Sequence, residues 1–92
     1  MRLLGFSKSS QTFLHTLSAK QVRQVSFAIF KLLQNPLPND SIKLKNDFRT
    51  CYYRISVGEY RVIYHFDDIA VYVCIIGRRN DGDVCKKFGY LV

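Results

Sequence analysis

The sequence predicts an α+β fold in which an N-terminal strand and a helical hairpin cover one face of an antiparallel sheet. The expected order is β-α-α-β-β-β, with room for one extra short strand and with a short helix at the C-terminus. Apolar residues recur about every 3.6 residues in the first third of the chain, and every second residue from position 51 onward. The chain has 92 residues, 48% of them hydrophobic, which suffices for one core but not for two. We therefore expect residues 1–92 to form a single domain.

The first third predicts a strand and two helices. Residues 2–6 can form a short strand, and three serines after it can cap a short helix: Ser7, Ser9 and Ser10. The buried face of that helix would consist of Phe13, Leu14 and Leu17. A second helix opens at Ser18, with Gln21 completing a capping box, and ends before Pro36. Its apolar stripe would consist of Val22, Val25, Ile29, Leu32 and Leu33. A tight connection makes the two helices an antiparallel hairpin.

Three strands in close succession follow, and they predict an antiparallel meander. Their expected ranges are residues 51–57, 60–66 and 69–76. The connections Gly58-Glu59 and Asp67-Asp68 suit two-residue hairpin turns. Such turns would pair Val57 with Tyr60 and Phe66 with Ile69, which fixes the register of the whole meander.

This register divides the strands into two faces. One is continuously apolar and is expected to form the core under the helices: Tyr53, Ile55, Val57, Val62, Tyr64, Phe66, Ile69, Val71, Val73 and Ile75. The other mixes cations, aromatic rings and hydroxyls: Tyr52, Arg54, Ser56, Arg61, Ile63, His65, Ala70, Tyr72 and Cys74. Such a mixture suits single-stranded nucleic acid, whose phosphates pair with cations while bases stack on rings. Taken alone, it suits a solvated outer face equally well.

The charge balance points to an anionic partner. Lys and Arg number 14 against 7 Asp and Glu, a net charge of +7, which favours nucleic acid first and an acidic protein second. Three cysteines without a C-x-x-C pair, and no visible leader or membrane span, suit a reducing cytoplasm. No nucleotide-binding loop, serine-hydrolase motif or metal-ligand spacing is visible. We therefore expect no metal, no cofactor and no membrane partner.

Two adjacent arginines, Arg78 and Arg79, emerge where the last strand ends. With Arg54 and Arg61 they would form a cluster without compensating acids, which is costly unless an anion fills it. An arginine-lined site can bind a phosphodiester and stabilise the charge of its transition state, while RNA supplies its own 2′-hydroxyl as nucleophile. The remaining candidates for RNA binding are Tyr52, Lys43, Lys45 and Lys86.

The proton acceptor for such a reaction is not evident from the sequence. Arginine stays protonated and cannot serve. His65 has a suitable intrinsic pKa, but its place near the second turn favours a structural role beside Tyr52. A final helix capped by Asn80 or Asp81 would place Val84, Lys87, Phe88 and Leu91 on one stripe.

Two stretches give the chain a family resemblance. Y-R-I-S-V-G-E-Y-R-V-I-Y spans residues 53–64, and I-G-R-R-N-D-G-D-V spans residues 76–84. With the order of elements, they make the whole chain resemble the RelE branch of the RelE/ParE bacterial toxin superfamily. The resemblance implies the toxin half of a type II toxin–antitoxin pair: a ribosome-dependent endoribonuclease that cleaves mRNA in the A site. It also implies an antitoxin partner in a toxin–antitoxin hetero-oligomer.

The resemblance also assigns roles to individual residues. Arg61 matches the strand arginine that contacts the scissile phosphate, and Arg79 the arginine that stabilises the transition state or leaving group. Arg54 stands where RelE has a catalytic lysine. In two departures from the pattern, Ser56 replaces a second lysine and Cys85 replaces a tyrosine near the scissile site. A thiol cannot stack on a base, although a thiolate can accept a proton.

These departures keep two other functions open. A ParE-like inhibitor of DNA gyrase would use the same fold without hydrolysis, and an attenuated member would bind only antitoxin or RNA. The retained arginines favour the nuclease, whereas Ser56 and Cys85 lean towards the alternatives. Growth arrest on expression separates an active toxin of either kind from an attenuated one.

Overall fold

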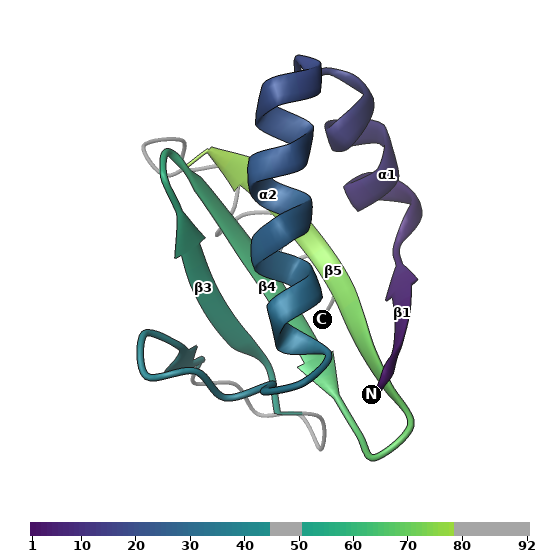
Figure 1. Cartoon of the computed structure of the whole chain (residues 1–92), viewed down its shortest axis with the longest axis vertical. Helices are drawn as coiled ribbons and strands as arrows, with labels where there is room; N and C mark the ends of the chain where they lie inside the picture. Colours follow the sequence, from purple (N-terminus) through teal and green to yellow (C-terminus); the bar gives the residue numbers. More distant parts are fainter. Residues whose placement is uncertain (45–50, 79–92) are drawn as a thin grey trace.

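A computed structural model describes residues 1–44 and 51–78 of the chain (Figure 1). The predicted α+β class is confirmed: two helices pack on a five-stranded sheet. In chain order the elements are β1 (Leu3–Phe6), α1 (Lys8–His15), α2 (Ala19–Leu32), β2 (Ile42–Lys43), β3 (Tyr53–Val57), β4 (Tyr60–Phe66) and β5 (Ala70–Arg78). The predicted C-terminal helix lies outside the described residues.

The sheet has the strand order β1-β5-β4-β3-β2. Strands β2 to β5 are antiparallel, as predicted, and β2 is the extra short strand. The N-terminal strand was expected to cover the sheet but is part of it: β1 pairs in parallel with β5, with Leu3 opposite Ala70 and Phe6 opposite Val73, so the complete sheet is mixed. The N-terminal strand thereby lies beside the last described one.

Both helices begin at the predicted serine caps. Ser7 caps α1 by accepting from the backbone N–H of Ser10, and Ser18 and Gln21 form the predicted capping box of α2. Figure 1 shows α1 rising beside β5 and α2 returning across the sheet in the opposite direction. Neither helix is long and apolar enough to cross a membrane within the part of the chain that the structure describes.

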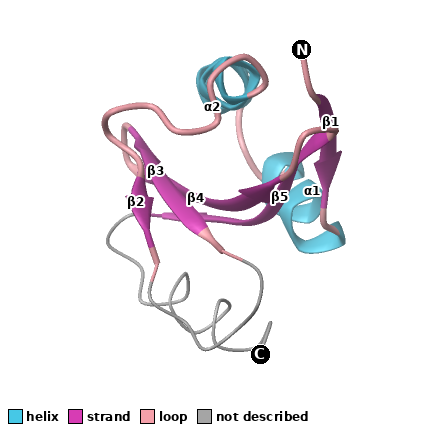
Figure 2. Ribbon diagram, turned by 90° about the horizontal axis from the view of Figure 1, so that it is seen from below, coloured by secondary structure: helices cyan, strands magenta, loops and turns pink. Residues whose placement is uncertain are grey.

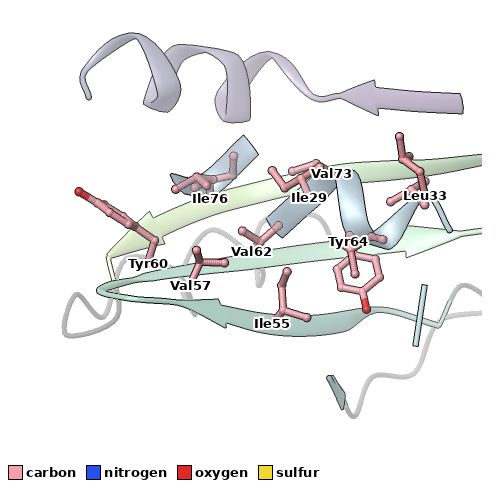
Figure 3. Close-up of a cluster of buried hydrophobic side chains, with 12 residues drawn as sticks. Ile29, Leu33, Ile55, Val57, Tyr60, Val62, Tyr64, Val73 and Ile76 are labelled. Carbon is pink, nitrogen blue, oxygen red and sulfur yellow. The ribbon is translucent and has the colours of Figure 1, made fainter. Parts of the chain in front are cut away.

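The main core lies between α2 and the sheet. Val25, Ile29 and Leu32 of α2 are fully buried, as the predicted stripe requires. Figure 3 shows Ile29 among side chains of β3, β4 and β5. The strands contribute Ile55, Val57, Tyr60, Val62, Tyr64, Val71, Val73 and Ile76. α1 is tied to the edge of this core, since the buried Ser10 hydroxyl donates to the Val73 carbonyl at 3.1 Å.

The first hairpin of the meander has the predicted register. Val57 pairs with Tyr60, and the turn depends on Gly58, whose φ of 58° lies in the left-handed region that favours glycine. A Cβ there would also lie 2.7 Å from Nε2 of Gln24. Because Gln24 is flexible and can move aside, the positive φ is the reason that this position favours glycine.

The predicted register of the second hairpin is wrong. Phe66 pairs with Val71 rather than with Ile69. The cause is Asp67, whose Oδ1 accepts from the backbone N–H groups of both Ile69 and Ala70 at 2.8 Å and so stabilises a longer turn. Ile69 was expected in the core but is 67% exposed.

A bulge in β5 moves a second residue to the other face. Val73 pairs with Tyr64 and Ile75 with Ile63, so Cys74 is an extra residue opposite the Ile63–Tyr64 step. Ile75 therefore shares a face with Ile63, not with the main core as predicted, and Ile76 enters the core instead. The bulge therefore determines which side chains of β5 lie on the same face of the sheet as the strand arginines.

Candidate nucleic-acid interface

The face of the sheet opposite α2 carries the candidate arginines, and we call it the arginine face. In Figure 2, α2 lies on the other side of the sheet. The members of the arginine face in the described strands are Arg54, Ser56, Arg61, Ile63, His65, Tyr72 and Ile75. Its middle is less polar than expected, because Ile63 and Ile75 are buried in a second apolar cluster with Leu44, Tyr52 and Cys74.

Arg54 and Arg61 come together as predicted. Arg54 pairs with Ile63, and Arg61 pairs with Ser56. The two arginines are therefore diagonal neighbours on adjacent strands, with Cα atoms about 7–8 Å apart. Both are half-buried, and the Nε atom of each is buried without a hydrogen-bond partner in the part of the chain that the structure describes.

An unpartnered buried guanidinium N–H has a free-energy cost, because water no longer solvates it and nothing replaces the water. Two such groups side by side repel each other as well. The four described acidic residues lie in loops or turns and not on the strands of the arginine face: Asp40, Glu59, Asp67 and Asp68. An anion bound between Arg54 and Arg61 would relieve both penalties.

The structure does not place Arg78 beside these two arginines. Arg61 pairs with Gly77, whereas Arg78 pairs with Tyr60, whose side chain is buried in the main core. Alternation along the strand therefore puts Arg78 on the helix side of the sheet, at the exposed end of β5. Lys43 lies in the edge strand β2, opposite Tyr53. Four other candidates lie outside the described residues: Lys45, Arg79, Cys85 and Lys86.

Three rings form a row across the arginine face at its other end. His65 stacks on Tyr72, with centroids 4.8 Å apart and planes at 23°, and meets Tyr52 edge-on at 5.5 Å. The predicted neighbourhood of His65 and Tyr52 is confirmed. His65 lies four residues along β4 from Arg61 on the same face, a separation of about 13 Å. That separation along the strand places His65 at a distance from a phosphate held by Arg61.

Burial changes the acidity of two groups in this region. Desolvation lowers the pKa of His65, and the nearby Asp67 carboxylate opposes the shift only in part. Burial raises the pKa of the Cys74 thiol to about 11. At neutral pH His65 is therefore an uncharged ring, and Cys74 is a thiol rather than a nucleophilic thiolate.

The lowered pKa of His65 predicts a pH dependence of stability. The unfolded chain binds more protons than the folded chain below about pH 6.5, so the free energy of unfolding should fall as the pH drops through that value. Urea unfolding at about pH 7.5 and 5.5 measures the change, and Asp67 titrates below this window. His65→Gln should unfold with a smaller difference between the two pH values. An unchanged difference would assign the effect to another group.

The fold matches several solved structures. The matches include the archaeal RelE of a RelE–RelB complex from Pyrococcus horikoshii OT3, with 25% identity and a TM-score of 0.73 over 86% of this chain and 96% of that one. The isolated Escherichia coli RelE toxin matches with 19% identity and a TM-score of 0.73 over 99% and 98%. The RelBE2 toxin–antitoxin complex of Mycobacterium tuberculosis matches with 23% identity and 0.70 over 85% and 98%. No family model matches the sequence, and no curated protein does.

These matches cover 85–99% of this chain and 96–98% of the matched chains. The resemblance stated from residues 53–64 and 76–84 is thus supported independently by the path of the backbone. The chain has a RelE-like fold.

Proposed function

We propose that this protein is the toxin of a type II toxin–antitoxin pair and cleaves mRNA in the A site of the ribosome. The observation that carries the proposal is the Arg54–Arg61 pair, whose buried Nε atoms lack partners among the described residues of a RelE-like fold. A phosphodiester supplies the negative charge and the acceptor oxygens that these guanidiniums lack.

The proposed reaction needs little from the protein beyond charge and orientation. The 2′-oxygen of the RNA attacks the adjacent phosphorus, the bond to the 5′-oxygen breaks, and a 2′,3′-cyclic phosphate and a 5′-hydroxyl result. Arg61 holds the phosphate and stabilises its additional charge, with Arg54 beside it. Arg79 stabilises the negative charge on the leaving 5′-oxygen. Cys85, as a thiolate, is the candidate acceptor for the 2′-hydroxyl proton. His65 is too far from Arg61 for this role.

The same proposal implies the partners. The neighbouring folds include RelE–RelB and RelBE2 complexes, which supports an antitoxin for this chain too. With a net charge of +7, the protein suits an antitoxin with an acidic segment that neutralises the arginine face. Ribosome and mRNA are the other partners, and the cytoplasm is the compartment that supplies both.

Primer extension on mRNA held in programmed ribosomes tests the proposal. We expect cleavage within the A-site codon when purified protein and ribosomes are both present, and none on free mRNA. Intact message under both conditions would contradict the nuclease. In that case the departures at Ser56 and Cys85 favour gyrase inhibition, which a supercoiling assay detects, or an attenuated toxin whose expression does not arrest growth.

A further inference from the structure

A recess of about 280 Å³ lies beside the ring of Tyr72 on the arginine face, at the end away from Arg61. Gly5 of β1 and His65, Tyr72 and Cys74 are among the residues that line it. The parallel pairing of β1 with β5 creates the recess, because Gly5 lies directly opposite Tyr72 and contributes no side chain. The proposed cleavage reaction assigns no role to this part of the face.

The ring of Tyr72 is placed so that another planar group can stack on it. It is 38% exposed although its strand neighbours Val71 and Val73 are buried. The stack on His65 supports it from one side. Burial keeps His65 uncharged at neutral pH, so the support is a flat and neutral ring.

Gly5 leaves room for this arrangement. A Cβ at position 5 would lie 3.2 Å from Cδ1 of Tyr72 and 3.7 Å from Cε1. The edge of the phenol ring therefore lies over the backbone of β1, in space that any other residue would restrict. A Cβ at position 5 would require the ring to shift slightly from its present place.

We propose that Tyr72, supported by His65 and Gly5, binds an unpaired RNA base by stacking, as a subsite next to the arginines. The inference rests on the proposed function, which brings single-stranded RNA to this face. Aromatic rings beside a cationic track are the usual means of holding single-stranded bases. About 13 Å of strand separates His65 from Arg61, so the stacked base belongs to a nucleotide near the one that is cleaved, not to that nucleotide itself.

Binding of a short single-stranded RNA with 2′-O-methyl riboses, which lacks the nucleophile, measures the subsite directly by fluorescence anisotropy. We expect Tyr72→Leu, which keeps the bulk but loses the ring, to weaken binding about ten-fold, and Tyr72→Phe to bind as wild type does. Phe27→Ala is the matched control, since Phe27 is an exposed aromatic residue on α2. Circular dichroism and thermal unfolding confirm that each variant is folded.

A scan with abasic sites locates the stacked base. Removing one base at a time should reveal a single position whose loss weakens binding to the wild type about ten-fold but has little effect on Tyr72→Leu. This pairing of one base with one ring would not arise if Tyr72 were merely structural. Gly5→Ala should reproduce a small part of the defect, because its Cβ makes the ring shift slightly.

The outcomes separate this inference from the proposed function. Arg61→Ala should weaken binding of every RNA alike and reduce the salt dependence. If it does so while Tyr72→Leu binds as tightly as wild type, the subsite is overturned and the arginine site stands. The recess would then be left for a side chain of a protein partner. If the wild type binds no RNA at all, the subsite is overturned, and primer extension on programmed ribosomes decides the proposed function separately.

Discussion

Arg61→Ala is expected to lower the rate of A-site cleavage by about 10²- to 10³-fold, which is the usual effect of removing one preorganised group that stabilises transition-state charge. Arg61 is half-buried on a rigid central strand, and Arg54 is its diagonal neighbour. Its guanidinium is therefore held in place before RNA arrives. The chemical step should be affected more than RNA binding, because the charge on the phosphate rises as the 2′-oxygen attacks.

Single-turnover cleavage on programmed ribosomes measures this effect, with primer extension as the readout. Arg61→Lys should recover part of the rate, since it keeps the charge but loses the two-pronged contact that a guanidinium makes with phosphate. Arg23→Ala is the matched control, because Arg23 is exposed on α2 away from the arginine face. Cleavage by Arg61→Ala at the wild-type rate would remove the arginine pair from the mechanism.

The stability of Arg61→Ala carries a second expectation. Its Nε donates no hydrogen bond among the described residues, and its removal relieves repulsion with Arg54. The variant should therefore lose activity with little loss in its free energy of unfolding. A large drop in stability would indicate a structural arginine instead.

The pairing of Arg54 with Arg61 could be predicted from sequence because it depends only on local signals. Gly58 and Glu59 stand between two alternating strands, and a two-residue turn fixes which residues face each other. The second hairpin could not be predicted in the same way. Its register depends on a side chain, Asp67, that bonds two backbone N–H groups and lengthens the turn.

The bulge at Cys74 could not be predicted from the sequence for a different reason. Cys74, Ile75 and Ile76 are consecutive apolar residues, so the sequence contains no break in alternation that would mark an extra residue. Only the pairing with β4 shows which of them faces the core. The recess at Tyr72 could not be predicted from local sequence either. It depends on the pairing of β1 with β5, which are far apart along the chain.

Tyr64→Ala is expected to reduce the free energy of unfolding by about 3–5 kcal/mol, as the loss of a fully buried aromatic side chain usually does. Tyr64 is 0% exposed, and its ring lies next to those of Tyr53 and Phe66. It is also the core residue at the bulge step, opposite Val73. A cavity there would loosen the strand that carries Arg61.

Tyr64→Phe separates the ring from its hydroxyl. The hydroxyl donates to the Pro36 carbonyl at 2.7 Å, so its removal should cost about 1 kcal/mol. Burial raises the pKa of Tyr64 to about 12. The folded chain therefore holds a proton that the unfolded chain releases near pH 10, and stability should fall as the pH rises above that value. Tyr64→Phe should show a smaller fall. Urea unfolding measures both effects, and equal losses for Tyr64→Ala and Tyr64→Phe would mean that the bond to Pro36, not the packing of the ring, carries the stabilisation.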